Sequence, residues 1–268
     1  MKTRALSALA AAVASVVLLG GCSASTAPQT SPPFGATSLA APTKKYVIAT
    51  VGDSHALRFG QGMEQVAGGA YQVVRAAYGG CGLMRESRYK LSSYGLTDVH
   101  DANRACDDWD SEWRQLIEQS KPDAVLLTTS YWDVNAQKID DTDTFLLITD
   151  RKFRDTYAAS LQEGIDILSA QGARVYLDNS LPYLGNDMPS AEAMSKTVTE
   201  VYRKAKAAGK NVGLLDLRGQ LCDGNTCPST IDGIAVMDET SHPAGESLAR
   251  QSRWILNTIS ADLGTVQQ

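Results

Sequence analysis

The chain has 268 residues, of which 43% are hydrophobic and 21% charged, a composition typical of globular proteins and unlike that of disordered chains, collagens or coiled-coil rods. At about 100–200 residues per domain, this length allows one large domain or two small ones. The formal net charge is -5 and no run of lysine and arginine occurs, so no nucleic acid is expected as a partner, because binding to a phosphate backbone requires clustered positive charge.

The N-terminal segment 1–21 is interpreted as a lipoprotein signal peptide. Lys2 and Arg4 precede the uncharged apolar run 5–19, which is shorter than the about 20 residues that span a membrane. The run is followed by Gly-Gly and Cys22, a pattern that resembles the bacterial lipobox; an ordinary secretory signal with a chance cysteine is the alternative. Lipidation of Cys22 would hold the protein on the extracytoplasmic face of the cell membrane.

Residues 22–45 are predicted to be a tether between the lipid and a folded domain. Residues 23–43 carry no charge, and 12 of these 21 residues are Ser, Thr or Pro, a composition that cannot bury a core. The remaining residues, 46–268, contain neither a second linker nor an internal repeat. A single domain is therefore expected there.

Short apolar runs alternate with segments of helical periodicity along this domain. The predicted elements, in chain order, are strand 46–51, helix 56–66, strand 71–77, helix 107–119, strand 124–129, helix 153–170, strand 174–178, helix 191–208, strand 212–217 and helix 244–262. This alternation predicts a three-layer α/β/α domain with a central, mostly parallel five-stranded sheet. In such sheets, ligands bind at the carboxyl ends of the strands.

Four cysteines follow Cys22, an even number that favours two disulfides in an exported protein. Cys222 and Cys227 enclose the turn-forming sequence Asp-Gly-Asn-Thr, which can bring their sulfurs together, and Cys81 is then left to pair with Cys106. A structural zinc site is the alternative. No two cysteines have Cys-x-x-Cys spacing and no histidine lies near the second pair, so no metal is expected.

The turn after the first strand, Gly52-Asp53-Ser54, contains a candidate nucleophile. Gly52 permits a tight turn that places Ser54 at a helix N-terminus, where unpaired backbone N–H groups can stabilise a developing anion. Serine is also a common helix N-cap. The turn alone therefore leaves both roles open for Ser54.

A serine nucleophile needs a base, and the chain has three histidines. His55 is adjacent to Ser54, so its ring should point away from the hydroxyl, and it is expected to line the cleft. His100 lies in a polar stretch expected to be a surface loop. His242 lies in the carboxylate-rich segment 238–243, directly before the last helix, where one loop can supply both the base and the acid that orients it.

Gly-Asp-Ser near the N-terminus, with Asp and His on one loop near the C-terminus, resembles the SGNH (GDSL-type) hydrolase family. Residues 52–56, 221–228 and 238–242 are similar to the SGNH domains associated with acyltransferase-3 membrane proteins, which act on short acyl esters of envelope glycans. The resemblance spans most of residues 46–262. It implies a flavodoxin-like α/β/α fold and a serine esterase that needs no cofactor.

By this resemblance, Ser54 is the nucleophile and His242 the general base, and the backbone N–H groups of Ser54 and Gly80 form the oxyanion hole. The family usually has its Asp three residues before the His, where this chain has Glu239. Asp238 is the preferred triad acid, allowing one extra loop residue, and Glu239 is the alternative.

The Gly-x-Asn that the family carries after the third strand is missing here, and Ser130-Tyr131-Trp132 stand in its place. Asn135 could substitute as an oxyanion donor, although a role in loop structure is the alternative. An unreplaced donor could cost about 10²–10³ in rate. Tyr131 and Trp132, together with His55, are the expected substrate-binding residues, since aromatic rings beside a cleft suit sugar stacking; core packing is the alternative for Trp132.

These observations predict a lipid-anchored, extracytoplasmic serine esterase that removes acyl groups, acetyl above all, from envelope glycan or glycolipid esters. One alternative is an O-acyltransferase that uses the same site with a membrane acyltransferase partner. The other is a catalytically inactive lipoprotein that binds a glycan or lipid.

Overall fold

The computed structural model describes residues 34–85, 87–92, 96–101, 106–129, 132–139, 143–179, 188–223 and 227–266. The chain divides into residues 1–31 and 32–268, and only the second unit is described below. The predicted signal peptide, Cys22, the first part of the tether and Tyr131 lie outside the described residues.

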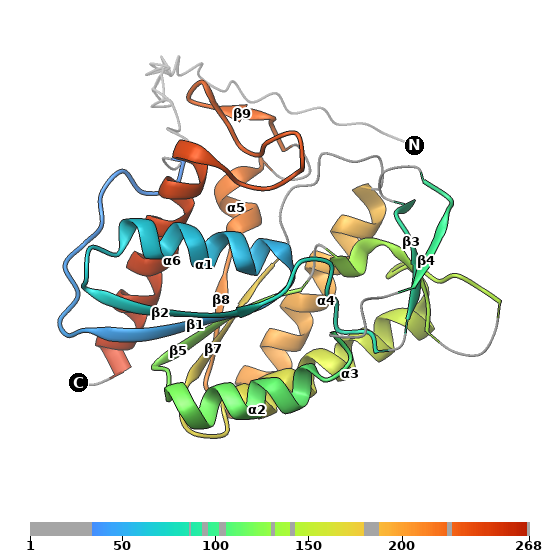
Figure 1. Cartoon of the computed structure of the whole chain (residues 1–268), viewed down its shortest axis with the longest axis horizontal. Helices are drawn as coiled ribbons and strands as arrows, with labels where there is room; N and C mark the ends of the chain where they lie inside the picture. Colours follow the sequence, from blue (N-terminus) through green and yellow to red (C-terminus); the bar gives the residue numbers. More distant parts are fainter. Residues whose placement is uncertain are drawn as a thin grey trace, which may run out of the picture. The chain divides into compact units, whose positions relative to one another are not determined.

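A parallel sheet of five strands in the order β2-β1-β5-β7-β8 forms the centre of this unit (Figure 1). The strands are β1 (Tyr46–Gly52), β2 (Tyr71–Ala77), β5 (Ala124–Thr128), β7 (Arg174–Asp178) and β8 (Val212–Leu215). All five residues of the central strand β5 are buried, as expected of a strand covered on both faces. The predicted parallel five-stranded sheet is confirmed.

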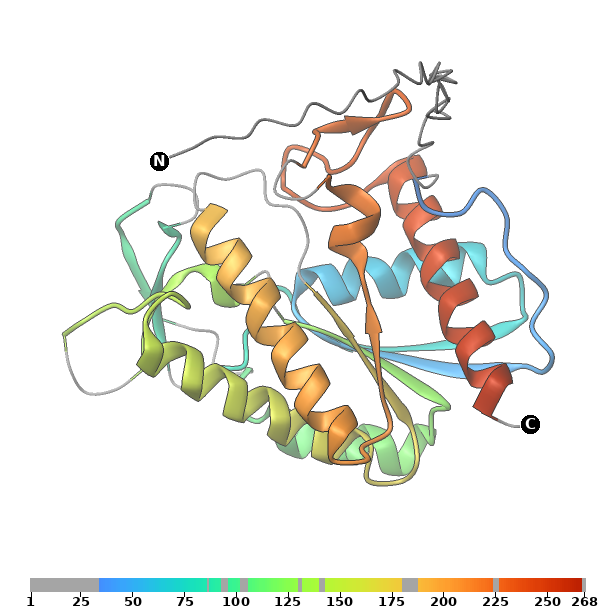
Figure 2. The same cartoon turned by 180° about the vertical axis from the view of Figure 1, so that it is seen from behind.

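Helices cover both faces of the sheet (Figures 1 and 2). They are α1 (Ser54–Val66), α2 (Trp109–Ser120), α3 (Arg151–Leu168), α4 (Met188–Ala207) and α6 (Gly245–Val266). Successive strand residues point to opposite faces of the sheet. Ala49 and Val125 therefore pack in the core formed with α2, α3 and α4. Ile48 and Leu126 pack in the second core, which is formed with α1 and α6. The three-layer α/β/α prediction is therefore correct. No helix in the described part of the chain is long and apolar enough to span a membrane.

Two small antiparallel sheets were not predicted. The first has the order β4-β3-β6, and the second pairs β9 with β10. Their strands are β3 (Arg88–Lys90), β4 (Val99–Asp101), β6 (Ala136–Lys138), β9 (Thr230–Ile231) and β10 (Ile234–Ala235). His100, expected in a loop, lies on β4, whose three residues are all exposed. Strands of two or three residues are too short to show the alternation of apolar and polar residues that reveals longer ones.

The last part of the segment assigned to the tether packs on the domain. The Phe34 side chain is 1% exposed and lies in the core with α1 and α6. Asn257 on α6 donates a hydrogen bond from its side chain to the carbonyl of Ser38 (3.0 Å). Phe34 is the only aromatic residue in 23–43, and its burial removes a large apolar side chain from water. The packed unit thus begins before Tyr46.

Two disulfides join Cys81 to Cys106 and Cys222 to Cys227, which confirms both predicted pairings. The first closes a loop of 25 residues in sequence separation, and the second a loop of five. On the chain-entropy model the longer loop contributes more stability. The short bridge instead restrains its immediate neighbourhood.

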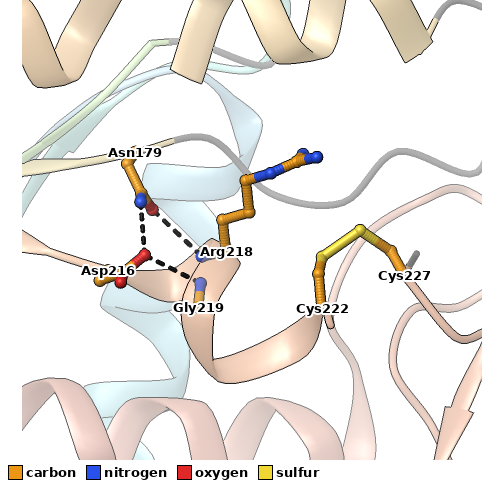
Figure 3. Close-up of a disulfide and its surroundings, with 6 residues drawn as sticks. All are labelled: Asn179, Asp216, Arg218, Gly219, Cys222 and Cys227. Atoms are coloured by element: carbon orange, nitrogen blue, oxygen red, sulfur yellow. Dashed lines mark hydrogen bonds between the residues drawn. A yellow bond between two sulfur atoms is a disulfide. The ribbon is translucent and has the colours of Figure 1, made fainter. Parts of the chain in front are cut away.

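The second disulfide follows the short helix α5 (Leu217–Leu221), whose start is fixed to the sheet (Figure 3). Asp216 caps this helix by accepting a hydrogen bond from the backbone N–H of Gly219 (2.8 Å). The same carboxylate oxygen accepts a hydrogen bond from the side chain of Asn179, directly after β7. The disulfide therefore joins a firmly held helix to the chain that leads toward His242.

Candidate active site

The nucleophile turn is shaped by a close approach between β1 and β5. Gly52 has φ +122°, and a Cβ atom at this position would lie 1.8 Å from the carbonyl oxygen of Thr128, so only glycine fits. The next backbone N–H, that of Asp53, donates to the same carbonyl (2.8 Å). The chain then turns into α1, whose first residue is Ser54. This agrees with the predicted position of Ser54 at a helix N-terminus.

Ser54 and His242 meet although 188 positions separate them. His242 Nε2 and Ser54 Oγ lie 2.8 Å apart. The histidine loop is closed by its own backbone: the N–H of Asp238 donates to the carbonyl of His242 (2.8 Å), and that of Ser241 to the carbonyl of Asp238 (3.0 Å). The two ends of the chain thus bring the hydroxyl of the candidate nucleophile into contact with the imidazole of the candidate base.

Asp238 is the carboxylate that belongs to this loop. Its Oδ1 accepts hydrogen bonds from the backbone N–H and the hydroxyl of Thr240 (2.9 and 2.6 Å) and from the backbone N–H of His242 (3.1 Å). Partial burial acts to raise the pKa of Asp238, but these hydrogen bonds outweigh it and hold the pKa below 3.8. Glu239 is exposed and makes no hydrogen bond or ion pair with any residue that the structure describes.

The His242 ring is suited to accept a proton near neutral pH. Burial lowers its pKa below 6.5, and Arg58 acts in the same direction, whereas the Thr240 carbonyl and Asp238 act to raise it. The ring is therefore neutral at pH 7, with a nitrogen able to act as a base. The second ring nitrogen, Nδ1, lies 3.1 Å from the Thr240 hydroxyl.

His55 is buried against the ring of His242 instead of lining an open cleft. Its side chain is 0% exposed, and its ring centroid lies 4.7 Å from that of His242. Burial, followed by the proximity of His242, lowers its pKa well below 6.5, while a hydrogen bond with the Ser241 carbonyl acts to raise it. The expected cleft position is not observed, because the ring is buried against His242 and the Ser241 carbonyl of the histidine loop.

The loop after β2 lies beside the nucleophile. A Cβ atom at Gly79 would lie 4.0 Å from Ser54 Cβ, and Gly80 has φ +78°. The next residue, Cys81, ties this loop to Cys106. Gly80 therefore stands in the region expected for an oxyanion donor.

Two buried carboxyl groups that the sequence did not assign hold the site together. Asp53 accepts hydrogen bonds from the backbone N–H groups of His55 (2.9 Å) and Trp132 (3.1 Å). Asp133 accepts one from the backbone N–H of Leu83 (2.9 Å), in the loop after β2. Together they connect the nucleophile turn, the 3-10 helix Trp132–Val134 and the glycine loop. Asp53 could be seen in the sequence as part of the Gly-Asp-Ser motif, but the motif did not indicate its role. Nothing in the sequence distinguished Asp133 from surface carboxylates.

Aromatic rings extend from the glycine loop to the small sheet. Trp132 is half-buried, with a ring atom 3.8 Å from where a Cβ of Gly80 would lie. Its ring meets that of Tyr89 edge-on at 4.7 Å, and Tyr89 stacks on His100 at 5.4 Å. We call these three residues the aromatic row; it begins at the site and ends on exposed β4.

A small pocket lies between the nucleophile turn and the first disulfide. Gly52, Cys81, Trp109 and Thr129 are among its lining residues, and its volume is about 20 Å³. A water molecule needs about 10–15 Å³ by this kind of measure. The pocket therefore has room for a very small group. Within the described residues, no cluster of three or more His, Cys, Asp or Glu could hold a metal ion.

The family model described as "SGNH domain (fused to AT3 domains)" matches residues 21–246. The chain belongs to this family. A GDSL-like lipase from Bacteroides thetaiotaomicron is similar in structure, with 14% identity, a TM-score of 0.50, and coverage of 84% of this chain and 93% of that chain. The C-terminal catalytic domain of peptidoglycan O-acetyltransferase A from Streptococcus pneumoniae has 14% identity, a TM-score of 0.43, and coverage of 84% and 95%. No match was found among curated proteins.

In this SGNH domain, the side chain of Asn135 forms a hydrogen bond within its own loop. The side chain is 2% exposed and donates a hydrogen bond from Nδ2 to the carbonyl of Trp132 (3.1 Å). That contact fits the loop role, which was one of the two predicted for Asn135. The amide thereby helps to hold the 3-10 helix that carries Trp132.

The stability of the domain should fall as pH rises above neutrality. Burial, and for Asp53 also the proximity of Asp178, raises the pKa of Asp53 from 3.8 to about 8 and that of Asp133 to about 7. Above pH 7 His55 and His242, whose pKa values are lowered below 6.5 in the folded chain, are largely neutral in both states, whereas the folded chain still holds carboxyl protons that the unfolded chain has released. The free energy of unfolding should decrease there by up to about 1.4 kcal/mol per pH unit per group.

Urea unfolding measured at pH 7.0, 7.75 and 8.5 tests this expectation. Asp133→Asn removes one of the two groups and should make the decrease shallower, whatever its effect on stability at pH 7.0. A free energy of unfolding that is constant or increases across this range in the wild-type protein would contradict the assignment of the raised pKa values.

Proposed function

We propose that the protein is a serine esterase that removes short acyl groups, acetyl above all, from ester-bearing saccharides of the cell envelope. The observation that carries this proposal is the 2.8 Å contact between Ser54 Oγ and His242 Nε2. It joins a serine at a helix N-terminus to a histidine whose lowered pKa keeps it neutral. This is the arrangement that activates a serine hydroxyl.

In this mechanism, Ser54 Oγ attacks the ester carbonyl carbon while His242 Nε2 takes the hydroxyl proton. The backbone N–H groups of Ser54 and Gly80 stabilise the negative oxygen that forms. His242 then gives its proton to the departing sugar oxygen, which leaves an acyl-serine. A water molecule, deprotonated by the same nitrogen, attacks this ester and releases the carboxylic acid and free Ser54.

The size of the small pocket supports a short acyl group. Gly52, two residues before Ser54, and Cys81, next to Gly80, line this pocket, which places it beside the nucleophile turn and the glycine loop. At about 20 Å³, it suits a methyl-sized group better than a fatty acyl chain. An acetyl ester is therefore the favoured substrate.

The aromatic row supports a saccharide on the other side of the ester. Pyranose rings present C–H groups that pack on aromatic faces, and Trp and Tyr provide such faces together with polar edges. Trp132 touches the glycine loop and His100 is exposed, so the row gives a sugar chain a continuous path away from Ser54.

The family match favours a second candidate, an acyltransferase. Its first half-reaction is identical, and a sugar hydroxyl replaces water in the second. The description of the family as fused to AT3 domains supports a membrane acyltransferase as the source of the acyl group. The acceptor that reacts with acyl-Ser54 distinguishes the two enzymes.

A lipid anchor at Cys22, on the extracytoplasmic face of the membrane, completes the proposal. The Gly-Gly-Cys end of the apolar run 5–19 supports it. Two disulfides in a chain of this size are also in keeping with an oxidising compartment.

A fluorophosphonate should label Ser54, and Ser54→Ala should abolish both labelling and the cleavage of 4-nitrophenyl acetate. His242→Ala should reduce cleavage by several orders of magnitude, because the members of such a site act as a unit.

Asp238→Ala should lower the rate much more than Glu239→Ala, and the reverse order would transfer the acid role to Glu239. A wild-type protein that neither labels nor cleaves, yet binds a glycan, would instead be an inactive binding lipoprotein.

Loss of the outer aromatic rings should weaken saccharide binding without affecting the chemical step. Tyr89→Ala and His100→Ala are expected to raise KM for an O-acetylated oligosaccharide about two- to tenfold, the range of one aromatic contact, and to leave 4-nitrophenyl acetate cleavage unchanged. Val99→Ala is the matched control, because Val99 is an exposed neighbour on β4 outside the row. Equal losses on both substrates would argue against a sugar-binding role.

Intact-mass analysis of protein extracted from the producing cell's membranes should show an N-terminal Cys22 carrying acyl chains. Cys22→Ser should release the chain from the membrane fraction, since lipid anchoring of this type depends on the thiol. A mature, unmodified protein in the soluble fraction of wild-type cells would refute the anchor.

A further inference from the structure

The histidine loop has an unusual separation between its acid and its base. Asp238 precedes His242 by four positions, and Ser241 in between has φ +61°. Asp238 Oδ1 is already occupied by two backbone N–H groups, those of Thr240 and His242. The hydroxyl of Thr240 contacts the same carboxylate oxygen on one side and the His242 imidazole on the other.

The direction of each hydrogen bond in this chain can be deduced. A hydroxyl has a single hydrogen, and that of Thr240 is donated to Asp238 Oδ1 at 2.6 Å, the short distance typical of a bond to a carboxylate. The oxygen of Thr240 can therefore only accept from His242 Nδ1, 3.1 Å away. Nδ1 must then carry the proton, which leaves the Nε2 lone pair directed at the Ser54 hydroxyl, 2.8 Å away.

We propose that Thr240 is a positioning residue whose hydroxyl relays the negative charge of Asp238 to His242 and fixes the tautomer in which Nε2 is the base. This inference rests on the proposed esterase function and names a fourth member of its catalytic chain. The Thr240 hydroxyl contacts both the Asp238 carboxylate and the His242 ring, at 2.6 and 3.1 Å. Because Thr240 is exposed, its hydroxyl is not needed to satisfy a buried group.

Other groups face the imidazole and remain in place when the hydroxyl is removed. Arg58 on α1 acts on the ring electrostatically, the neutral, buried His55 lies against it, and the Thr240 backbone carbonyl accepts a hydrogen bond from it. None of these depends on the Thr240 side chain. A comparison of variants at this position therefore isolates the hydroxyl.

The test compares Thr240→Val, which keeps the shape, with Thr240→Ser, which keeps the hydroxyl. We expect Thr240→Val to lower kcat for 4-nitrophenyl acetate about 10- to 100-fold, the range of one hydrogen bond in a charged chain, with KM unchanged. Thr240→Ser should restore most of the rate. In the Asp238→Asn background, Thr240→Val should cause little further loss, because both changes break the same chain.

Nitrogen-15 NMR of labelled histidine provides a readout that does not require activity. The wild-type His242 should show a protonated Nδ1 at pH 8, and Thr240→Val should give a mixture of tautomers. Thr240→Ser should return the signal to the wild-type form. Thr156→Val, the same change at an exposed threonine on α3, serves as the matched control and should leave the tautomer and kcat unaltered.

The outcomes separate this inference from the proposed function. Wild-type kcat, wild-type tautomer and normal fluorophosphonate labelling in Thr240→Val would overturn the relay and leave the esterase proposal standing. A wild-type protein that fails to label would remove the esterase proposal, and the NMR comparison would still decide whether Thr240 sets the tautomer. Thermal unfolding of each variant shows whether a loss of kcat comes from unfolding of the domain. If unfolding explained the whole loss of kcat, this would also contradict the relay.

Discussion

The hydrogen bond between Ser54 and His242 depends on how two helices pack. Ser54 begins α1, and His242 directly precedes α6, so the relation between these helices sets the distance between nucleophile and base. The two helices pack closely because α1 has a glycine where it meets α6. A Cβ atom at Gly62 would lie 2.3 Å from Ser252 Oγ. A larger residue at position 62 would push the helices apart and separate Ser54 Oγ from His242 Nε2 without altering either residue.

Around this contact, neutral and charged carboxyl groups have different tasks. Asp53 and Asp133 are buried away from solvent, hold backbone N–H groups, and gain protons as a result. Asp238 is less buried, and its hydrogen bonds keep it charged beside the base. The environment, not the residue type, therefore decides which aspartate acts as a structural clamp and which as an electrostatic partner.

The sequence predicted the five main strands, the helices around them, both disulfides and the partners Ser54 and His242, because long periodic segments and short spacings are local signals. It missed the small β4-β3-β6 sheet and misjudged His55, since burial of one ring under a loop depends on contacts between distant segments. The role of Thr240 was also invisible. It depends on which atom of the loop the hydroxyl faces, and no residue pattern encodes that distance.

The packing of residues 34–43 on α6 has a geometric consequence for a protein anchored at Cys22. Only the 12 residues 22–33 then remain to span the distance between the bilayer and the folded unit, whereas the composition alone suggested twice that length. Fully extended, 12 residues reach about 40 Å. With the proposed anchor at Cys22, the docked segment would therefore limit the distance between the folded unit and the membrane surface to about 40 Å.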